Sequence, residues 1–240
     1  MLEKILLFII GCILGSFFWL VAERWPQGLS ILRPASHCSS CQTPLRKRDL
    51  IPLLSALQLK FRCRDCRHPF SKMSFFAELA SGCFFVFTFP QFLTSTTLLP
   101  FVWLLTAFMM ALADIRHYIL EPKIFYPASL MLWLWHFHQG AAVQWLTVLY
   151  CIGISGFLLI FLRGRFGFGD LLLLLSWSPW LNLQQFCLLL IFASSLGLAT
   201  FGIYYVTQRK HHRFPRSQEL PLPFIPFLAS GLWLILRFGL

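Results

Sequence analysis

Two sets of residues in this sequence have the types and spacing that chemistry requires. Four cysteines form the pairs Cys38-Ser-Ser-Cys41 and Cys63-Arg-Asp-Cys66, with 21 residues between the pairs. Two aspartates, Asp114 and Asp170, each lie where a long apolar run meets more polar sequence. An ionisable group at such a boundary is costly to desolvate and is a candidate for function. The first set predicts a metal centre, and the second predicts an acid–base pair.

Two CxxC pairs can direct four thiolates at one tetrahedral zinc ion, as in a zinc ribbon. This pattern implies no open coordination position, so the predicted zinc is structural. Disulfides are the alternative, and a reducing compartment disfavours them. A redox CxxC would not need two copies. The predicted metal ligands are Cys38, Cys41, Cys63 and Cys66.

The chemistry that fits the two aspartates is hydrolysis of a peptide bond. Two neighbouring carboxylates cannot both ionise easily, so they share a proton. One can then activate water while the other, protonated, polarises the scissile carbonyl. Simple helix-end placement stays open as an alternative, because Asp170 would be a good residue at a helix amino terminus. Asp114 falls at a helix carboxyl end, where the helix dipole disfavours a carboxylate.

Four further residues are predicted to position the substrate at this pair. Gly167 and Gly169 precede Asp170, and without a Cβ they allow a close backbone approach or a strained turn. Glu78 is an acid within an apolar run, and Glu121 follows Asp114 closely in sequence. These acids are expected to shape the site or to assist the aspartates.

The elements that must position these residues are membrane helices. Of the 240 residues, 58% are hydrophobic and 12% are charged, with a mean hydropathy of +0.70. A soluble domain carries roughly twice that charged fraction. The apolar runs do not alternate in polarity, so they favour helices over a barrel. The prediction is an all-α polytopic transmembrane bundle of about eight helices, at 5–22, 75–93, 97–113, 124–138, 142–162, 171–184, 186–206 and 221–238. The first run is expected to be a retained helix rather than a cleaved leader.

Charge sets the orientation of these helices. The net charge is +11, and 18 of the 20 basic residues fall in the segments 24–72, 116–123, 163–165 and 209–216. With eight spans and an outside amino terminus, all four segments face the cytoplasm, as the positive-inside rule requires. Nucleic acid is therefore not needed as a partner to explain the charge. The expected parts are a first helix at 1–22, a cytoplasmic four-cysteine, zinc-ribbon-like loop domain at 23–74 and a membrane core at 75–240.

An ordered set of motifs resembles the type IV prepilin peptidases, which are GxGD aspartyl proteases. The set comprises Gly15-Ser16-Phe17, Val21-Ala22 with Arg24 and Pro26, the two CxxC pairs, Glu78-Leu79, Asp114, Gly167-Phe168-Gly169-Asp170, and Pro223-Phe224-Ile225-Pro226-Phe227-Leu228-Ala229 with Gly231. The resemblance covers nearly the whole chain. The sequence departs from the family pattern at Trp19, Glu121, Leu172 and Ile225.

The resemblance implies that Asp114 and Asp170 are the catalytic pair of a multi-pass protein of the bacterial cell membrane. The family cleaves a short basic leader just before the hydrophobic helix of type IV prepilins or pseudopilins of secretion and competence systems. Cleavage occurs at the cytoplasmic face, so the implied partners are prepilin amino-terminal segments and the lipid bilayer. Many members then N-methylate the new amino terminus with S-adenosylmethionine, and their cysteine loop is tied to that activity.

Two other functions are compatible with parts of the sequence. A non-catalytic membrane scaffold could use the cysteine loop to bind a partner, and it would depend on the cysteines more than on the aspartates. A small transporter could use the aspartates as proton carriers. A transporter of that kind would show internal repeats with paired Gly or Pro interruptions, and the sequence has no convincing repeat.

Overall fold

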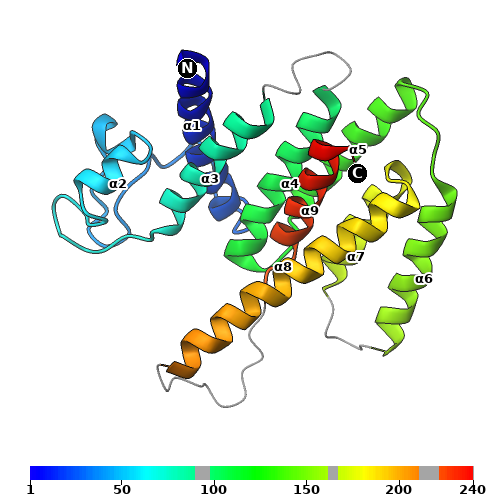
Figure 1. The fold of residues 1–240 in the computed structure, drawn as a ribbon. Coiled ribbons are helices and arrows are strands. Elements are labelled where there is room, and N and C mark those ends of the chain that lie inside the picture. The colour runs from blue at the N-terminus through cyan, green and yellow to red at the C-terminus, as the bar shows by residue number, and fades with distance from the viewer. Residues whose placement is uncertain (90–97, 162–166, 211–221, 240) are drawn as a thin grey trace. The chain divides into compact units, whose positions relative to one another are not determined.

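The computed structural model describes residues 1–89, 98–161, 167–210 and 222–239, with the side chains of 208–210 left out, and this part of the chain is helical with no β-strand (Figure 1). It forms two compact units, residues 1–101 and 102–240. The division predicted at 1–22, 23–74 and 75–240 stays a prediction. In the structure the cysteine loop belongs to unit 1, together with the helices before and after it.

Each of the eight expected spans corresponds to a helix among the described residues, so the predicted helical architecture is confirmed. Positions 90–93, 97, 162 and 221 of these spans lie outside the described residues. The helices are α1 (Leu2–Arg24), α3 (Met73–Thr88), α4 (Leu98–His117), α5 (Pro122–His138), α6 (Trp145–Phe161), α7 (Phe168–Trp177), α8 (Leu183–Lys210) and α9 (Ile225–Phe238). Three segments are long and apolar enough to cross a membrane, namely α1, α4 and residues 183–207 of α8. Shorter apolar helices at α3, α6 and α9 accompany them. The chain is accordingly a membrane protein.

The turn between α7 and α8 has a clear physical cause. A 3-10 turn, η3 (Ser178–Trp180), ends α7, and α8 begins at Leu183. Asn182 Oδ1 accepts the Gln185 backbone N–H at 2.8 Å, and Gln185 Oε1 accepts the Asn182 N–H at 3.1 Å. This reciprocal pair is a capping box, which satisfies two amides that a helix start leaves unpaired.

In unit 1, α1 and α3 lie side by side because small residues line their contact (Figure 1). A Cβ built on Gly15 would lie 2.6 Å from Ser81 Cβ, and one on Gly82 would lie 2.7 Å from Cys12 Sγ. In a bilayer the hydrophobic effect does not drive helices together, so membrane helices associate through close van der Waals packing of this kind. The loop between these helices, residues 25–72, is called the cysteine loop below.

The close contact of α1 and α3 makes a testable prediction. Gly15→Ala is expected to lower the melting temperature, because the new methyl would also meet backbone atoms of α3 at 3.0 Å and overpacking costs about 1–3 kcal/mol. Gly153→Ala in α6 is the matched control, since nothing lies within 4 Å of its Cβ position. Thermal unfolding in detergent compares the two variants. Equal melting temperatures would contradict tight packing at Gly15.

In unit 2, α9 packs along α8, and both bury large apolar side chains between them (Figure 1). Phe186 and Leu189 of α8 and Leu228 and Leu232 of α9 are almost fully buried. The start of α9 carries Pro226, a residue that favours the first turn of a helix because that turn needs no donor from it. The place where α9 begins matters for the site described next.

Candidate active site and metal centre

Asp114 lies in the last turn of α4 and is held by the start of α9. Its side chain is buried, with 6% of the residue exposed. The backbone N–H of Ile225, the first residue of α9, donates to Asp114 Oδ2 at 3.0 Å, and the N–H of Phe224 donates as well. The first amides of a helix have no partner inside it and form a natural anion site. The amino terminus of α9 therefore compensates the unfavourable position that Asp114 has at the end of α4.

The chain turns sharply after Asp114. The N–H of Tyr118 donates to the Asp114 carbonyl at 2.8 Å, and Tyr118 has a φ of 56°. A left-handed residue of this kind ends a helix. Pro122 then opens α5 as its first residue. The link between α4 and α5 is consequently short, and it keeps the residues that follow Asp114 close to it in space.

Asp170 lies in the first turn of α7, half-buried. It is close enough to Asp114 for the charge of Asp114 to act on it. Two acids 56 positions apart in sequence therefore lie within electrostatic reach of each other in unit 2. Gly169 lies against the link after α4, since a Cβ on it would lie 2.7 Å from Leu120 Cβ.

The glycines beside Asp170 allow neighbouring atoms to approach closely, and their backbone conformation is ordinary. A Cβ on Gly167 would lie 2.9 Å from Asp170 Oδ2. Gly167 has a φ of −67°, which any residue adopts, and Gly169 is not among the positive-φ glycines of the described residues. Of the two uses predicted for these glycines, the structure shows the close approach and not the strained turn.

The two glutamates predicted to help the site lie in different units. Glu121 immediately precedes α5 and is buried in unit 2, directly after Leu120 of the α4–α5 link. Glu78 lies in α3 of unit 1, where its Oε2 accepts the backbone N–H of Leu53 at 2.8 Å. This bond gives Glu78 a structural partner in the cysteine loop. A role in substrate positioning stays a prediction for both residues.

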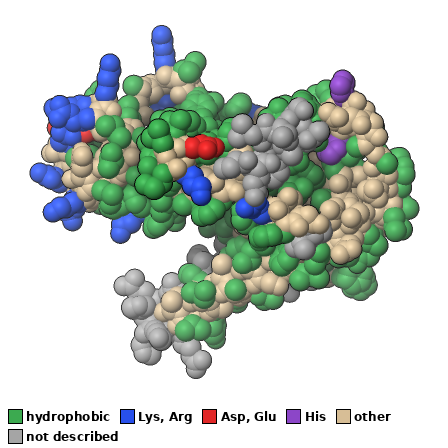
Figure 2. Space-filling model, turned by 45° about the horizontal axis from the view of Figure 1, so that its top comes forward, with side chains coloured by type: hydrophobic (Ala, Val, Ile, Leu, Met, Phe, Trp, Pro, Cys, Tyr) green, Lys and Arg blue, Asp and Glu red, His purple; other side chains and the backbone are tan. Residues whose placement is uncertain are grey.

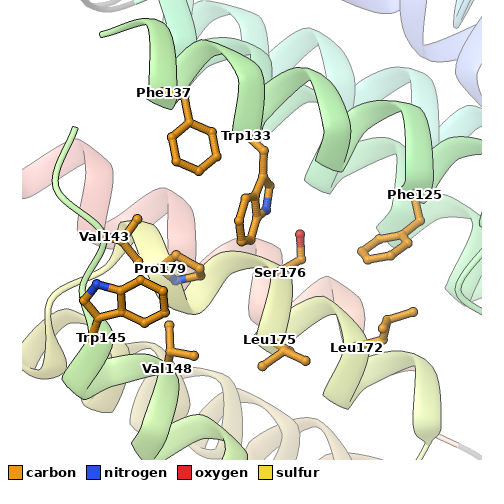
Figure 3. Close-up of a pocket in the computed structure, with 10 residues that line it drawn as sticks. All are labelled: Phe125, Trp133, Phe137, Val143, Trp145, Val148, Leu172, Leu175, Ser176 and Pro179. Carbon is orange, nitrogen blue, oxygen red and sulfur yellow. The ribbon is translucent and has the colours of Figure 1, made fainter. Parts of the chain in front are cut away.

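A cavity of about 370 Å³ lies between α5, α6 and α7 in unit 2 (Figure 3). It follows α7 from Leu172, two residues beyond Asp170, to Pro179. Aromatic side chains of α5 face it, and they are Phe125, Trp133 and Phe137. Ser176 is the one side chain of its lining with a hydroxyl, which donates to Ser129 Oγ at 3.0 Å. The cavity is therefore suited to apolar groups.

The four predicted metal ligands meet in the cysteine loop. Their sulfur atoms all lie within 4.8 Å of one another. Cys38 Sγ lies 3.7 Å from Cys66 Sγ, and Cys41 Sγ lies 3.8 Å from Cys63 Sγ. Four thiolates at about 2.3 Å from a tetrahedral zinc ion would be about 3.8 Å apart. All four are free cysteines, so this cluster could hold a metal ion.

The backbone around the two cysteine pairs repeats. The N–H of Cys38 donates to the Thr43 carbonyl at 3.1 Å, and the N–H of Cys63 donates to the His68 carbonyl at 2.8 Å. Gln42 and Arg67 have φ values of 58° and 59°, at the same place in each turn. Hydrogen bonds to the side chain and backbone of Thr43 lower the pKa of the Cys41 thiol to about 6. A thiolate is the form that binds metal.

Comparison with known proteins shows the family of this chain. Residues 98–202 match the type IV leader peptidase family, and residues 9–92 match the bacterial peptidase A24 N-terminal domain. A prepilin leader peptidase/N-methyltransferase of Bacillus subtilis is 30% identical over 245 residues, covering 98% of this chain and 94% of the relative. The chain belongs to the type IV leader peptidase family. The expected family membership is confirmed.

Other members of the type IV leader peptidase family are similarly related to this chain. A prepilin leader peptidase/N-methyltransferase of Myxococcus xanthus is 32% identical, over 95% of this chain and 71% of its own length. A type 4 prepilin-like proteins leader peptide-processing enzyme of Escherichia coli is 29% identical, over 92% and 88%. No solved structure matches the chain. The family is one of proteases, so the expectation of a peptidase is confirmed at that level.

The structure also shows features that the sequence analysis did not predict. Asp49, which follows three basic residues in sequence, has a side chain only 6% exposed and pairs with Arg64. It also accepts the backbone N–H of Arg46 at 3.3 Å. The backbone donors of Phe224 and Ile225 were not recognised as part of the site, because backbone amides carry no side-chain signal of their role.

Proposed function

We propose that this chain is a multi-pass aspartyl endopeptidase of the bacterial cytoplasmic membrane, with Asp114 and Asp170 as its catalytic pair. It removes the short basic leader of type IV prepilins or pseudopilins at the cytoplasmic face. The observation that supports the proposal is that two carboxyl groups, at the end of α4 and the start of α7, lie within electrostatic reach of each other, with one of them bonded to the first amide of α9. The orientation derived from basic residues puts all three helix ends on the same, cytoplasmic side.

The contacts divide the roles of the two aspartates. The amides of Phe224 and Ile225 favour the ionised form of Asp114, so Asp114 takes a proton from the attacking water. Asp170 then carries the shared proton and donates a hydrogen bond to the scissile carbonyl oxygen. The water oxygen bonds to the carbonyl carbon, and the C–N bond breaks as the leaving nitrogen takes up a proton. Neither a covalent intermediate nor a metal ion is required.

The cavity beside α7 supports a substrate with apolar residues after the cleaved bond. It begins at Leu172, near Asp170, and follows α7 for about 10 Å towards Pro179. A prepilin places its hydrophobic helix immediately after the cleavage site. The first apolar side chains of that helix would fit this cavity, which holds a volume typical of ligand pockets.

The cysteine loop is proposed to hold a structural zinc ion in its four-sulfur site. The spacing of the sulfur atoms suits tetrahedral zinc, and no protein ligand position is left open for catalysis. The relatives are named N-methyltransferases as well as peptidases. We therefore propose that the chain also methylates the new amino terminus, with S-adenosylmethionine as the methyl donor.

The experiment that tests the function uses the full chain in lipid nanodiscs. A synthetic prepilin segment, with its basic leader and hydrophobic helix, is incubated with the protein, and mass spectrometry identifies the products. We expect a cut just before the hydrophobic helix and, with S-adenosylmethionine, one added methyl group on the new amino terminus. A folded chain that binds prepilin segments without cutting any of them would instead support the scaffold. Cleavage without methylation would support the proposed peptidase activity and refute the proposed methyltransferase activity.

The close contact of Gly169 with the α4–α5 link predicts a rate effect. Gly169→Ala is expected to slow leader cleavage by about tenfold to a hundredfold, because its methyl would push on Leu120 and shift Asp170 relative to Asp114. Gly156→Ala is the control, since nothing lies within 4 Å of its Cβ position. Initial cleavage rates of both variants are compared with wild type. An unchanged rate for Gly169→Ala would show that the spacing of the aspartates does not depend on this contact.

A further inference from the structure

One edge of the cysteine loop is tied by a hydrogen bond to the apolar helix α3. The bond from the Leu53 N–H to Glu78 Oε2, 2.8 Å long, ties the loop to the sixth residue of α3. Five residues of helix rise correspond to about 7–8 Å from the start of α3. Leu53 has a φ of 59°, a conformation that a leucine rarely adopts. The loop backbone thus lies beside an apolar part of α3 and not far out in solvent.

The side chains next to Leu53 point outward and are apolar. Leu50 and Ile51 are each about half exposed, and Leu54 and Leu57 are each 55% exposed. Leu54 and Leu57 share one face of the short helix α2 (Leu54–Gln58), because residues three apart on a helix are neighbours. Ala56, on the other side, is buried. These four exposed apolar residues lie within one short segment, residues 50–57, and we call them the loop edge.

Positive charge directly precedes the loop edge. Arg46, Lys47 and Arg48 are exposed, and Figure 2 shows Lys and Arg side chains gathered at the end of unit 1 where the loop lies. The acid among them, Asp49, is turned inward to Arg64 and offers little opposing charge. Apolar side chains flanked by cations are the composition of segments that lie in the interface of an anionic membrane.

We propose that the loop edge lies in the lipid interface, with Leu50, Ile51, Leu54 and Leu57 among the outer acyl chains and with Arg46, Lys47 and Arg48 on anionic phospholipid headgroups. The partner is the surface of the same bilayer that α1 and α3 enter. The Glu78–Leu53 bond sets the depth, and the cations select the lipid. The four-sulfur site is thereby anchored to the membrane surface at one edge.

The test places the photoreactive residue p-benzoylphenylalanine at Leu54 of the full chain. The protein is reconstituted in nanodiscs of phosphatidylcholine with a minority of phosphatidylglycerol, and adducts are identified by mass after illumination. Ser40, an exposed polar residue of the first cysteine turn, is the control position. We expect lipid adducts at position 54 and far fewer at position 40. The fraction of these adducts that contains phosphatidylglycerol should exceed its fraction in the bilayer by roughly fivefold. This is the enrichment of anionic lipid that one cation near the membrane surface produces.

A second variant separates charge from apolar contact. Replacing Arg46, Lys47 and Arg48 together by glutamine should return phosphatidylglycerol in the adducts to its share of the bilayer, while the metal content of the loop stays at the wild-type level. Adducts formed with peptides from residues 102–240 would overturn the proposal, because the edge would then be covered by the second unit of the chain. The absence of lipid adducts at position 54 would overturn it as well. Both readouts are independent of cleavage, so a failed peptidase assay does not affect them.

Discussion

Asp114→Asn and Asp170→Asn are each expected to reduce leader cleavage by about 10²- to 10⁴-fold, the range that general acid–base catalysis contributes. An amide can neither take a proton from water, the role proposed for Asp114, nor carry the shared proton proposed for Asp170. Each substitution keeps the size of the side chain, so the helices still pack. Cleavage is measured with the full chain in nanodiscs and a prepilin segment.

The control for the aspartate variants is Asp65→Asn. Asp65 is exposed in the cysteine loop, and its loss should leave cleavage unchanged. Thermal unfolding of each variant shows whether the fold survives, which matters for Asp114 because it holds the start of α9. The double variant should lose little more than either single variant, since the two groups act as a unit. Substantial cleavage by either folded single variant would refute the proposed roles.

Cys63→Ser is expected to remove the bound metal and to loosen the cysteine loop. Zinc binding to four-sulfur sites of this kind supplies folding energy of about 10 kcal/mol or more. Cys63 is the buried member of the set, and it is held 3.8 Å from Cys41 by the second cysteine turn. Metal analysis should fall from one ion per chain to almost none, and limited proteolysis should cut within residues 25–72. A strong chelator should have the same effect on the wild type.

The matched control is Cys187→Ser, which changes a half-buried cysteine in α8 outside the four-sulfur site. It should leave metal content and proteolysis as in the wild type. Full metal content in Cys63→Ser would contradict the four-sulfur site. Cleavage by the metal-free loop variant would be informative in another way, because the proposed reaction itself uses no metal.

The helices could be predicted from sequence because a long apolar run in a bilayer must form all its backbone hydrogen bonds internally, and an α-helix does so. The spacing of the cysteine pairs likewise fixed one geometry, and the four sulfur atoms meet as expected. Both inferences depend on local chemistry that is visible within one segment of the chain.

The partners of Asp114, Asp49 and Gly169 could not be predicted from the sequence, because they are backbone groups or residues far away along the chain. Asp114 is held by amides 110 and 111 residues away, and an amide leaves no residue type to recognise. Asp49 follows three basic residues in sequence, yet its partner Arg64 comes from the second cysteine turn. The use of Gly169 is set by Leu120, a residue of a different link. In each case the contact exists only because the tertiary fold brings together residues that are distant in sequence.

The bond between Asp114 and the first amides of α9 has a consequence for biosynthesis. A nascent chain that has been made as far as α8 already contains both aspartates, but the amides of Phe224 and Ile225 do not yet exist. Until α9 has been synthesised and inserted, the Asp114 carboxyl would lack the backbone donors that favour its charge. We therefore expect a chain truncated before α9 to lack the arrangement of Asp114 that the proposed reaction requires.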